Sequence, residues 1–138
     1  MLLPQTAEYA LRAVLHIASF DGDRSVRVDE TAEALGIPRN YLAKTLHQLV
    51  RAGILTSARG PLGGFRLAIA AEELTLERII SPFGVATEHR CLLGKGLCGE
   101  SPGCAVHARW APVALQMCDF FGATKVADLL PASPSTLS

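Results

Sequence analysis

Three of the four cysteines lie close together, in a glycine-rich segment of the second half of the chain. Cys91, Cys98 and Cys104 are separated by six and then five residues. Nothing in the sequence indicates export, which disfavours disulfides, and three soft thiolates on a loop suit zinc or an iron–sulfur cluster. Structural zinc sites usually present Cys-x-x-Cys pairs, which this segment lacks. Longer spacings let a loop wrap a larger inorganic core, so the segment favours an iron–sulfur cluster, with zinc or thiol chemistry alone as the alternative.

The cysteine segment lacks a fourth ligand, and His107 is the nearest candidate. It stands three residues after Cys104, where a helix is expected to begin, so the two side chains would share one helical face. An ordinary surface or core histidine explains this residue equally well, and both interpretations stay open. Cys118 is expected to be a core residue, because Met117 and Phe120 are its neighbours.

The net charge is zero, but basic residues are concentrated in one window. Residues 37–66 contain no acidic residue. The basic residues of this window are Arg39, Lys44, Arg51, Arg59 and Arg66. A local positive surface commonly contacts phosphate, so the window indicates a nucleic-acid partner, and a solvated surface is the alternative.

The spacing of apolar residues predicts a helix-turn-helix in the first half of the chain. The expected elements are a helix over residues 5–20, a second over 30–35 that Asp29 caps and Gly36 ends, and a third that begins near Pro38 and ends at Gly53. Two strands are then expected over 54–58 and 65–69, and the glycine-rich residues 59–64 between them are typical of a hairpin turn. A helix-turn-helix followed by a hairpin is a winged helix. The expected fold is therefore mainly α, with a small β-hairpin wing and a long C-terminal helix.

In a helix-turn-helix, the N-terminal half of the second helix approaches the bases. The candidate base contacts are Asn40, Lys44, and Thr45 or Gln48, and the candidate phosphate contacts are Arg39 or Arg51. Arg59, at the tip of the hairpin, is expected to enter a minor groove. A solubilising helix face, or a winged helix that docks on protein, is the alternative.

After the hairpin, Thr75 is expected to cap a short helix through residues 79–80. A long helix is expected from about 104 to 121, and Pro112 inside it should kink it. Thr124 is expected to cap one last helical turn.

A chain of 138 residues is one small domain, which excludes the large enzyme folds. No Ser/His/Asp pattern and no paired-carboxylate motif is visible, so we expect no enzyme. No apolar run approaches the roughly 20 residues that a membrane span needs. Near the N-terminus, Glu8, Arg12 and His16 recur at helical spacing, which suits an amphipathic helix and not a signal peptide. We therefore expect a cytoplasmic protein without a membrane partner.

Three segments of the first half carry a family resemblance. They are Tyr9-Ala10-Leu11-Arg12, Ile37-Pro38-Arg39-Asn40-Tyr41-Leu42 and Arg59-Gly60-Pro61-Leu62-Gly63-Gly64-Phe65. Together they resemble the Rrf-type winged-helix regulators, and the likeness extends over roughly residues 1–130. The cysteine segment, from Arg90 to Trp110, resembles the branch of that family that includes the regulator of iron–sulfur cluster assembly.

This resemblance implies a homodimer, in which the long C-terminal helix crosses the partner, bound to a pseudo-palindromic operator in double-stranded DNA. It also implies a cluster that changes DNA affinity when it is gained, lost or oxidised. Some relatives take a carboxylate from the first helix of the partner subunit, which makes Glu8 an alternative fourth ligand. We favour His107, because a ligand on the same helical turn as Cys104 does not depend on the geometry of a dimer. We also favour a 2Fe–2S cluster over a 4Fe–4S cluster.

The sequence and the resemblance together predict a transcriptional regulator that senses iron, redox state or nitric oxide through an iron–sulfur cluster. A zinc- or thiol-based regulator is one alternative, and a small cluster-carrying electron-transfer or accessory protein with a protein-docking winged helix is another. The expected parts are a DNA-binding region over residues 1–86, a cluster-binding loop over 87–104, a dimerisation helix with a last helical turn over 105–130, and a disordered tail over 131–138.

Overall fold

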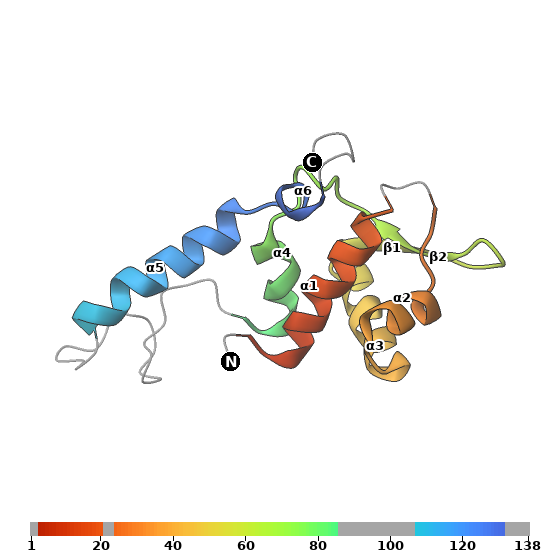
Figure 1. Cartoon of the computed structure of the whole chain (residues 1–138), viewed down its shortest axis with the longest axis horizontal. Helices are drawn as coiled ribbons and strands as arrows, with labels where there is room; N and C mark the ends of the chain where they lie inside the picture. Colours follow the sequence, from red (N-terminus) through yellow and green to blue (C-terminus); the bar gives the residue numbers. More distant parts are fainter. Residues whose placement is uncertain (1–2, 21–23, 86–106, 132–138) are drawn as a thin grey trace.

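The computed structural model describes residues 3–20, 24–85 and 107–131. Its elements are the helices α1 Gln5–Ala18, α2 Val28–Leu35 and α3 Arg39–Arg51, the strands β1 Leu55–Ala58 and β2 Gly64–Leu67, the helix α4 Leu76–Ile80, the 3-10 helix η1 Ser81–Phe83, and the helices α5 His107–Ala123 and α6 Val126–Leu129. Figure 1 shows α1 to α4 and the hairpin gathered into one body, from which α5 extends as an arm. The body has the expected order of a winged helix.

Helices α2 and α3 form the expected helix-turn-helix. Gly36 ends α2 in the left-handed conformation, with a φ of 66°, which glycine adopts without strain. Arg12 of α1 donates a hydrogen bond of 2.6 Å from Nη2 to the backbone carbonyl of Leu35, the last residue of α2. The first helix therefore satisfies a carbonyl that the end of α2 leaves without an intrahelical partner.

The start of α2 differs from the expectation. We expected Asp29 to cap this helix, but α2 begins at Val28, so Asp29 lies inside the first turn. Its carboxylate instead accepts a hydrogen bond from Nε of Arg39, the first residue of α3. The negative charge still lies near a helix N-terminus, where it is favourable, and the side chain also connects the two helices.

The wing is a two-stranded antiparallel hairpin in which Leu55 faces Leu67 and Ala58 faces Gly64. At Gly64 the φ is 142°, and a Cβ atom there would lie 2.6 Å from the carbonyl oxygen of Val26, so the position requires glycine. The approach is close because Val26 and Phe65 exchange two backbone hydrogen bonds, of 2.8 and 2.9 Å. The base of the wing is thereby anchored to the segment just before α2.

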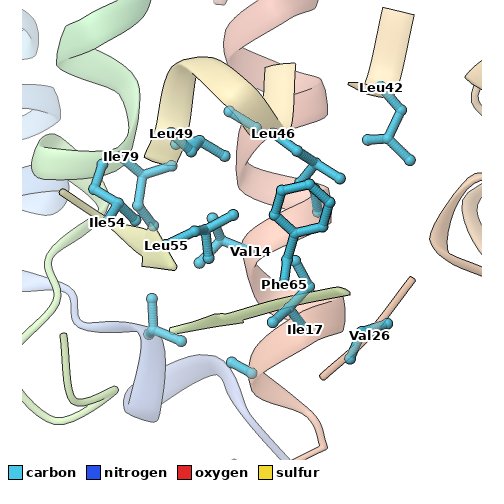
Figure 2. Packing of buried hydrophobic residues seen from close by; sticks show 14 of the residues in the cluster. Val14, Ile17, Val26, Leu42, Leu46, Leu49, Ile54, Leu55, Phe65 and Ile79 are labelled. Carbon is cyan, nitrogen blue, oxygen red and sulfur yellow. The ribbon is translucent and has the colours of Figure 1, made fainter. Parts of the chain in front are cut away.

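One apolar core joins α1, α3, α4 and the hairpin (Figure 2). Its buried side chains include Leu46 and Leu49 of α3, Leu55 of β1, Phe65 of β2 and Val14 of α1. Burying one such side chain contributes roughly 1.5–3 kcal/mol to folding. Because α3 and the wing pack into the same core, their relative positions are fixed by the same side chains.

A backbone bridge pairs Thr75, the residue before α4, with Lys125, the residue before α6. Thr75 caps α4 as expected, since its Oγ1 accepts a hydrogen bond from the backbone N–H of Arg78. The expected cap at Thr124 is wrong, because Lys125 is the residue that precedes α6. The N–H of Lys125 donates to the carboxylate of Asp128, which closes the first turn of α6 from inside the helix.

In the described part of the chain, the long helix α5 starts at His107, and Pro112 lies inside it. Within α5 only Ala114 is buried in the single chain, whereas Val113, Leu115 and Phe120 are each 44–51% exposed. Val113 and Phe120 are seven residues apart and therefore lie on the same side of α5, whereas Leu115 lies on nearly the opposite side. None of the helices in residues 3–20, 24–85 and 107–131 is long and apolar enough to cross a membrane.

Candidate nucleic-acid interface

One side of α3 carries basic and amide side chains, and the other side belongs to the core. The exposed basic and amide residues are Arg39, Asn40, Lys44 and Arg51, and the helix contains no acidic residue. Leu42, Leu46 and Leu49 are buried on the opposite side and hold the helix in place. Guanidinium, ammonium and amide groups form hydrogen bonds with phosphates and base edges. Four of the residues predicted from the sequence are therefore exposed where a duplex could reach them.

Two of the predicted base contacts do not lie with this group. Thr45 is buried, and its hydroxyl donates a hydrogen bond of 3.0 Å to the backbone carbonyl of Tyr41. Gln48 is half-buried, and its Nε2 donates a hydrogen bond of 2.8 Å to the carbonyl of Pro82 in η1. Both side chains are therefore engaged inside the protein.

Tyr41 was not among the DNA contacts predicted from the sequence. It lies in the first turns of α3 next to Asn40, and 62% of it is exposed. Its hydroxyl can donate a hydrogen bond to a phosphate oxygen, and its ring is a large apolar surface that is exposed to water. An aromatic residue on the polar side of a predicted recognition helix is the signal that could have identified it.

Three arginines line a hollow of about 310 Å³ between α3 and the wing, which we call the inner hollow. The carboxylate of Asp29 also lines it and is paired with Arg39. Arg39 comes from α3, Arg59 from the start of the wing turn, and Arg27 from the residue before α2. Guanidinium groups bind phosphate through two parallel hydrogen bonds, so this inner hollow has the chemistry of a backbone contact. Figure 1 places α3 and the wing at the end of the molecule away from the start of α5.

Of the predicted cluster ligands, the structure describes only His107 and Glu8. His107 is exposed at the start of α5, and Glu8 is exposed in the first turn of α1. In Figure 1 the start of α5 is the end of the arm, away from α1, so one chain does not bring these two residues together. Cys91, Cys98 and Cys104 lie outside the described residues. Within the described ranges, no three His, Cys, Asp or Glu side chains are grouped to hold a metal ion.

The fourth cysteine, Cys118, lies in α5 and is half-buried, which is less burial than the expected core position. Burial raises the pKa of its thiol, and the carboxylates of Asp119 and Glu77 raise this pKa further. A raised pKa leaves less thiolate at neutral pH, and thiolate is the form that binds metal and reacts. These surroundings support leaving Cys118 out of the ligand set.

Solved structures of other regulators share this fold. CymR, the global cysteine regulator of B. subtilis, superposes with a TM-score of 0.79 at 19% identity, and 94% of this chain covers 95% of that one. IscR of T. potens gives a TM-score of 0.74 at 20% identity, over 94% of this chain and 85% of that one. At these identities the likeness confirms the expected winged-helix fold.

Sequence comparison identifies the family. An inferred HTH-type transcriptional regulator of Aquifex aeolicus is 39% identical over 133 residues, which are 94% of this chain and 92% of that protein. The HTH-type transcriptional regulator IscR of Vibrio campbellii is 28% identical over 130 residues, which are 94% of this chain and 77% of that protein. The model of the Rrf2 family, described as iron-dependent transcriptional regulators, matches residues 3–132. The chain therefore belongs to the Rrf2 family of DNA-binding transcriptional regulators and is not an enzyme.

Proposed function

We propose that this chain acts as a homodimer that binds a pseudo-palindromic operator and changes its DNA affinity with the state of an iron–sulfur cluster. Iron supply, redox state or nitric oxide is the signal. The observation that carries the DNA-binding part is the acid-free exposed side of α3, which lies beside Arg59 of the wing. The cluster rests on the chemistry of the cysteine segment, and the dimer on Val113 and Phe120, which are exposed on one side of α5.

For DNA recognition, Asn40 and Lys44 are the proposed base contacts, because they are exposed in the N-terminal half of α3. Arg39 and Arg51 are the proposed phosphate contacts. Arg59 enters the adjacent minor groove, where a narrow groove concentrates negative potential. Thr45 and Gln48, whose observed hydrogen bonds lie within the protein, support α3 from behind.

For dimerisation, the proposed surface is the side of α5 that carries Val113 and Phe120. Both residues are exposed on this helix, which extends from the body. A second copy of α5 would cover these two residues through the same surface, as a two-fold interface requires. The two winged helices would then be held at a fixed distance, which is the geometry that two half-sites of an operator need.

For the cluster, the proposed ligands are Cys91, Cys98, Cys104 and His107. Three thiolates and one imidazole are ligands that iron in such clusters accepts, and a 2Fe–2S cluster is favoured over a 4Fe–4S cluster. Glu8 of the partner subunit is the alternative fourth ligand. When bound, the cluster would supply a group that reversibly gains or loses electrons or is lost as iron becomes scarce.

The path from the cysteine segment to DNA would begin at η1. Gln48 of α3 is hydrogen-bonded to Pro82, and Cys91 follows Pro82 by nine residues in the sequence. A change in how the cysteine segment is held would therefore act close to a direct contact of the recognition helix α3. The contact between Gln48 and Pro82 supports coupling between the cysteine segment and the DNA-binding surface. Such coupling requires an element between them that can adopt two arrangements.

Anaerobic purification tests the proposal. A coloured protein that absorbs between about 400 and 450 nm, contains iron and sulfide, and shifts a selected DNA duplex less at higher salt is the expected result. A colourless protein with stoichiometric zinc would support the structural-metal alternative, and a metal-free protein whose affinity follows thiol oxidation would support a thiol switch. A coloured protein that binds no duplex would support the electron-transfer or accessory function.

A further inference from the structure

A second hollow borders the wing, beside the segment that precedes α2. It encloses about 280 Å³ and is lined by Arg24, Ser25, Arg27, Arg66 and the turn residues 61–63. We call it the outer hollow. It shares Arg27 and Gly63 with the inner hollow, but none of the described residues that line it belongs to α3. Arginines therefore line two hollows beside the wing, whereas α3 reaches only one of them.

The fold itself positions the outer hollow. The two backbone hydrogen bonds between Val26 and Phe65 hold Arg27 directly against the base of the wing. Successive side chains of a strand point to opposite faces, so Phe65 is buried in the core and Arg66 is exposed. The Nε of Arg66 donates a hydrogen bond of 3.0 Å to Oγ of Ser25, which keeps this guanidinium beside the segment before α2.

The charge of the outer hollow is unbalanced. Arg24 donates two hydrogen bonds to the carboxylate of Glu30, of 3.0 and 2.5 Å, and its guanidinium lies 4.3 Å from the ring centre of Phe20. This pairing lowers the pKa of Glu30, so the carboxylate stays ionised and balances Arg24. Within the described residues, neither Arg27 nor Arg66 has a carboxylate within ion-pair distance. Two exposed positive charges therefore remain.

We propose that the outer hollow binds a backbone phosphate of the operator, outside the base pairs that α3 reads. The inference rests on the proposed DNA-binding function and extends it. A wing that enters a minor groove has a row of phosphates on each side of it, because the groove lies between the two strands. The inner hollow faces the strand nearer to α3. Arg66 faces the other strand, and Arg27 lies where the two hollows meet.

Charge complementarity selects DNA as the occupant. Unpaired guanidinium groups attract phosphate, and the outer hollow continues from the inner hollow through Arg27. Leu62, which is 91% exposed on its rim, adds an apolar contact for the sugars that line a groove. An acidic protein segment is the competing occupant, and the experiment below distinguishes the two.

The test uses the full-length protein and a duplex recovered by selection from a random library. The Arg27→Ala/Arg66→Ala variant is compared with the parent and with Arg78→Ala, which removes an exposed arginine from α4. For each subunit on DNA, the slope of log affinity against log salt should fall by about 1 for each of the two arginines, with the selected sequence unchanged. The Arg78→Ala control should keep the slope of the parent.

A second arm varies the DNA. Trimming the base pairs beyond the wing should weaken the parent, but should not weaken Arg27→Ala/Arg66→Ala further, because the contact is already lost. The Arg27→Lys/Arg66→Lys variant keeps both charges and should keep most of the salt slope, which separates phosphate binding from a folding defect. An unchanged slope and an unchanged response to trimming in the alanine variant would overturn the inference and leave an acidic protein segment as the occupant. A parent that binds no duplex would instead refute the proposed function.

Discussion

The side chain of Gln48, in the second half of α3, donates a hydrogen bond of 2.8 Å to the backbone carbonyl of Pro82 in η1. The two residues are 34 positions apart in the sequence, and both are half-buried. A side chain that is suited to read adenine therefore connects the recognition helix to the segment that leads towards the cysteines.

Gln48→Ala should lower the free energy of unfolding by about 1 kcal/mol, because the carbonyl of Pro82 loses its partner in a half-buried place. Urea denaturation measures this change. The operator sequence obtained by selection should stay the same. Asn40→Ala is the matched control, since it should leave stability nearly unchanged and relax the choice of one base. Relaxed base choice in Gln48→Ala would show that Gln48 leaves Pro82 and contacts DNA.

Gly64→Ala should destabilise the protein more than Gly60→Ala. Both glycines have a positive φ, of 142° and 98°, which costs another residue roughly 1–3 kcal/mol. A Cβ atom at Gly60 meets open space, whereas one at Gly64 lies 2.6 Å from the carbonyl oxygen of Val26 and forces the wing away from its anchor. Urea denaturation and DNA affinity should both show the difference, and equal losses in the two variants would contradict the anchoring role.

Replacing Cys91, Cys98 or Cys104 with Ala should abolish the absorption between about 400 and 450 nm and release iron, because each change removes a thiolate ligand. Cys118→Ala is the control, and its spectrum and iron content should match those of the parent. A loss of colour in Cys118→Ala would place this residue among the ligands.

The fourth ligand can be assigned by a second pair of variants. His107→Ala should retain part of the cluster in a less stable form, and Glu8→Ala should leave the spectrum unchanged. A normal spectrum for His107→Ala together with an altered one for Glu8→Ala would reverse the assignment. The cluster would then be completed by Glu8 of the partner subunit, the alternative ligand, and would lie at the subunit interface.

Val113→Glu should convert the proposed dimer into monomers, because a charge would enter an apolar interface between two copies of α5 at a cost of several kcal/mol. Sedimentation velocity measures the change. Ala34→Glu introduces the same charge at an exposed position of α2, in the winged-helix body, and should leave the dimer intact. A Val113→Glu protein that stays dimeric would show that another surface joins the subunits.

Local signals predicted most of the winged helix. Gly36 and Gly53, which were predicted to end the two helices, both have a positive φ, and the helical spacing of apolar residues identified the buried side of α3. These features depend on neighbours in the sequence, so periodicity and turn chemistry are sufficient to find them. The exposed residues Asn40 and Lys44 follow from the same periodicity, since they lie opposite the buried leucines.

The sequence did not predict features that depend on distant residues. Gln48 has the residue type and the spacing of a base contact, and only the position of Pro82, 34 residues away, engages it elsewhere. Asp29 has the residue type of a helix cap, but in the structure its carboxylate is paired with Arg39 of α3. Arg27 lies outside the acid-free window, and it reaches the wing only because Val26 pairs with Phe65. Each difference arises from tertiary contacts between residues that are distant in the sequence, and local sequence patterns do not show such contacts.

The wing is anchored through backbone atoms, and this has an evolutionary consequence. Val26 and Phe65 are joined by their peptide groups, while Arg59, Pro61 and Leu62 at the tip are exposed and form no part of the core. Substitutions at the tip would therefore alter what the wing recognises at little cost in folding stability. After gene duplication, two copies of such a regulator could diverge in operator preference through the tip alone, each retaining a core that already folds.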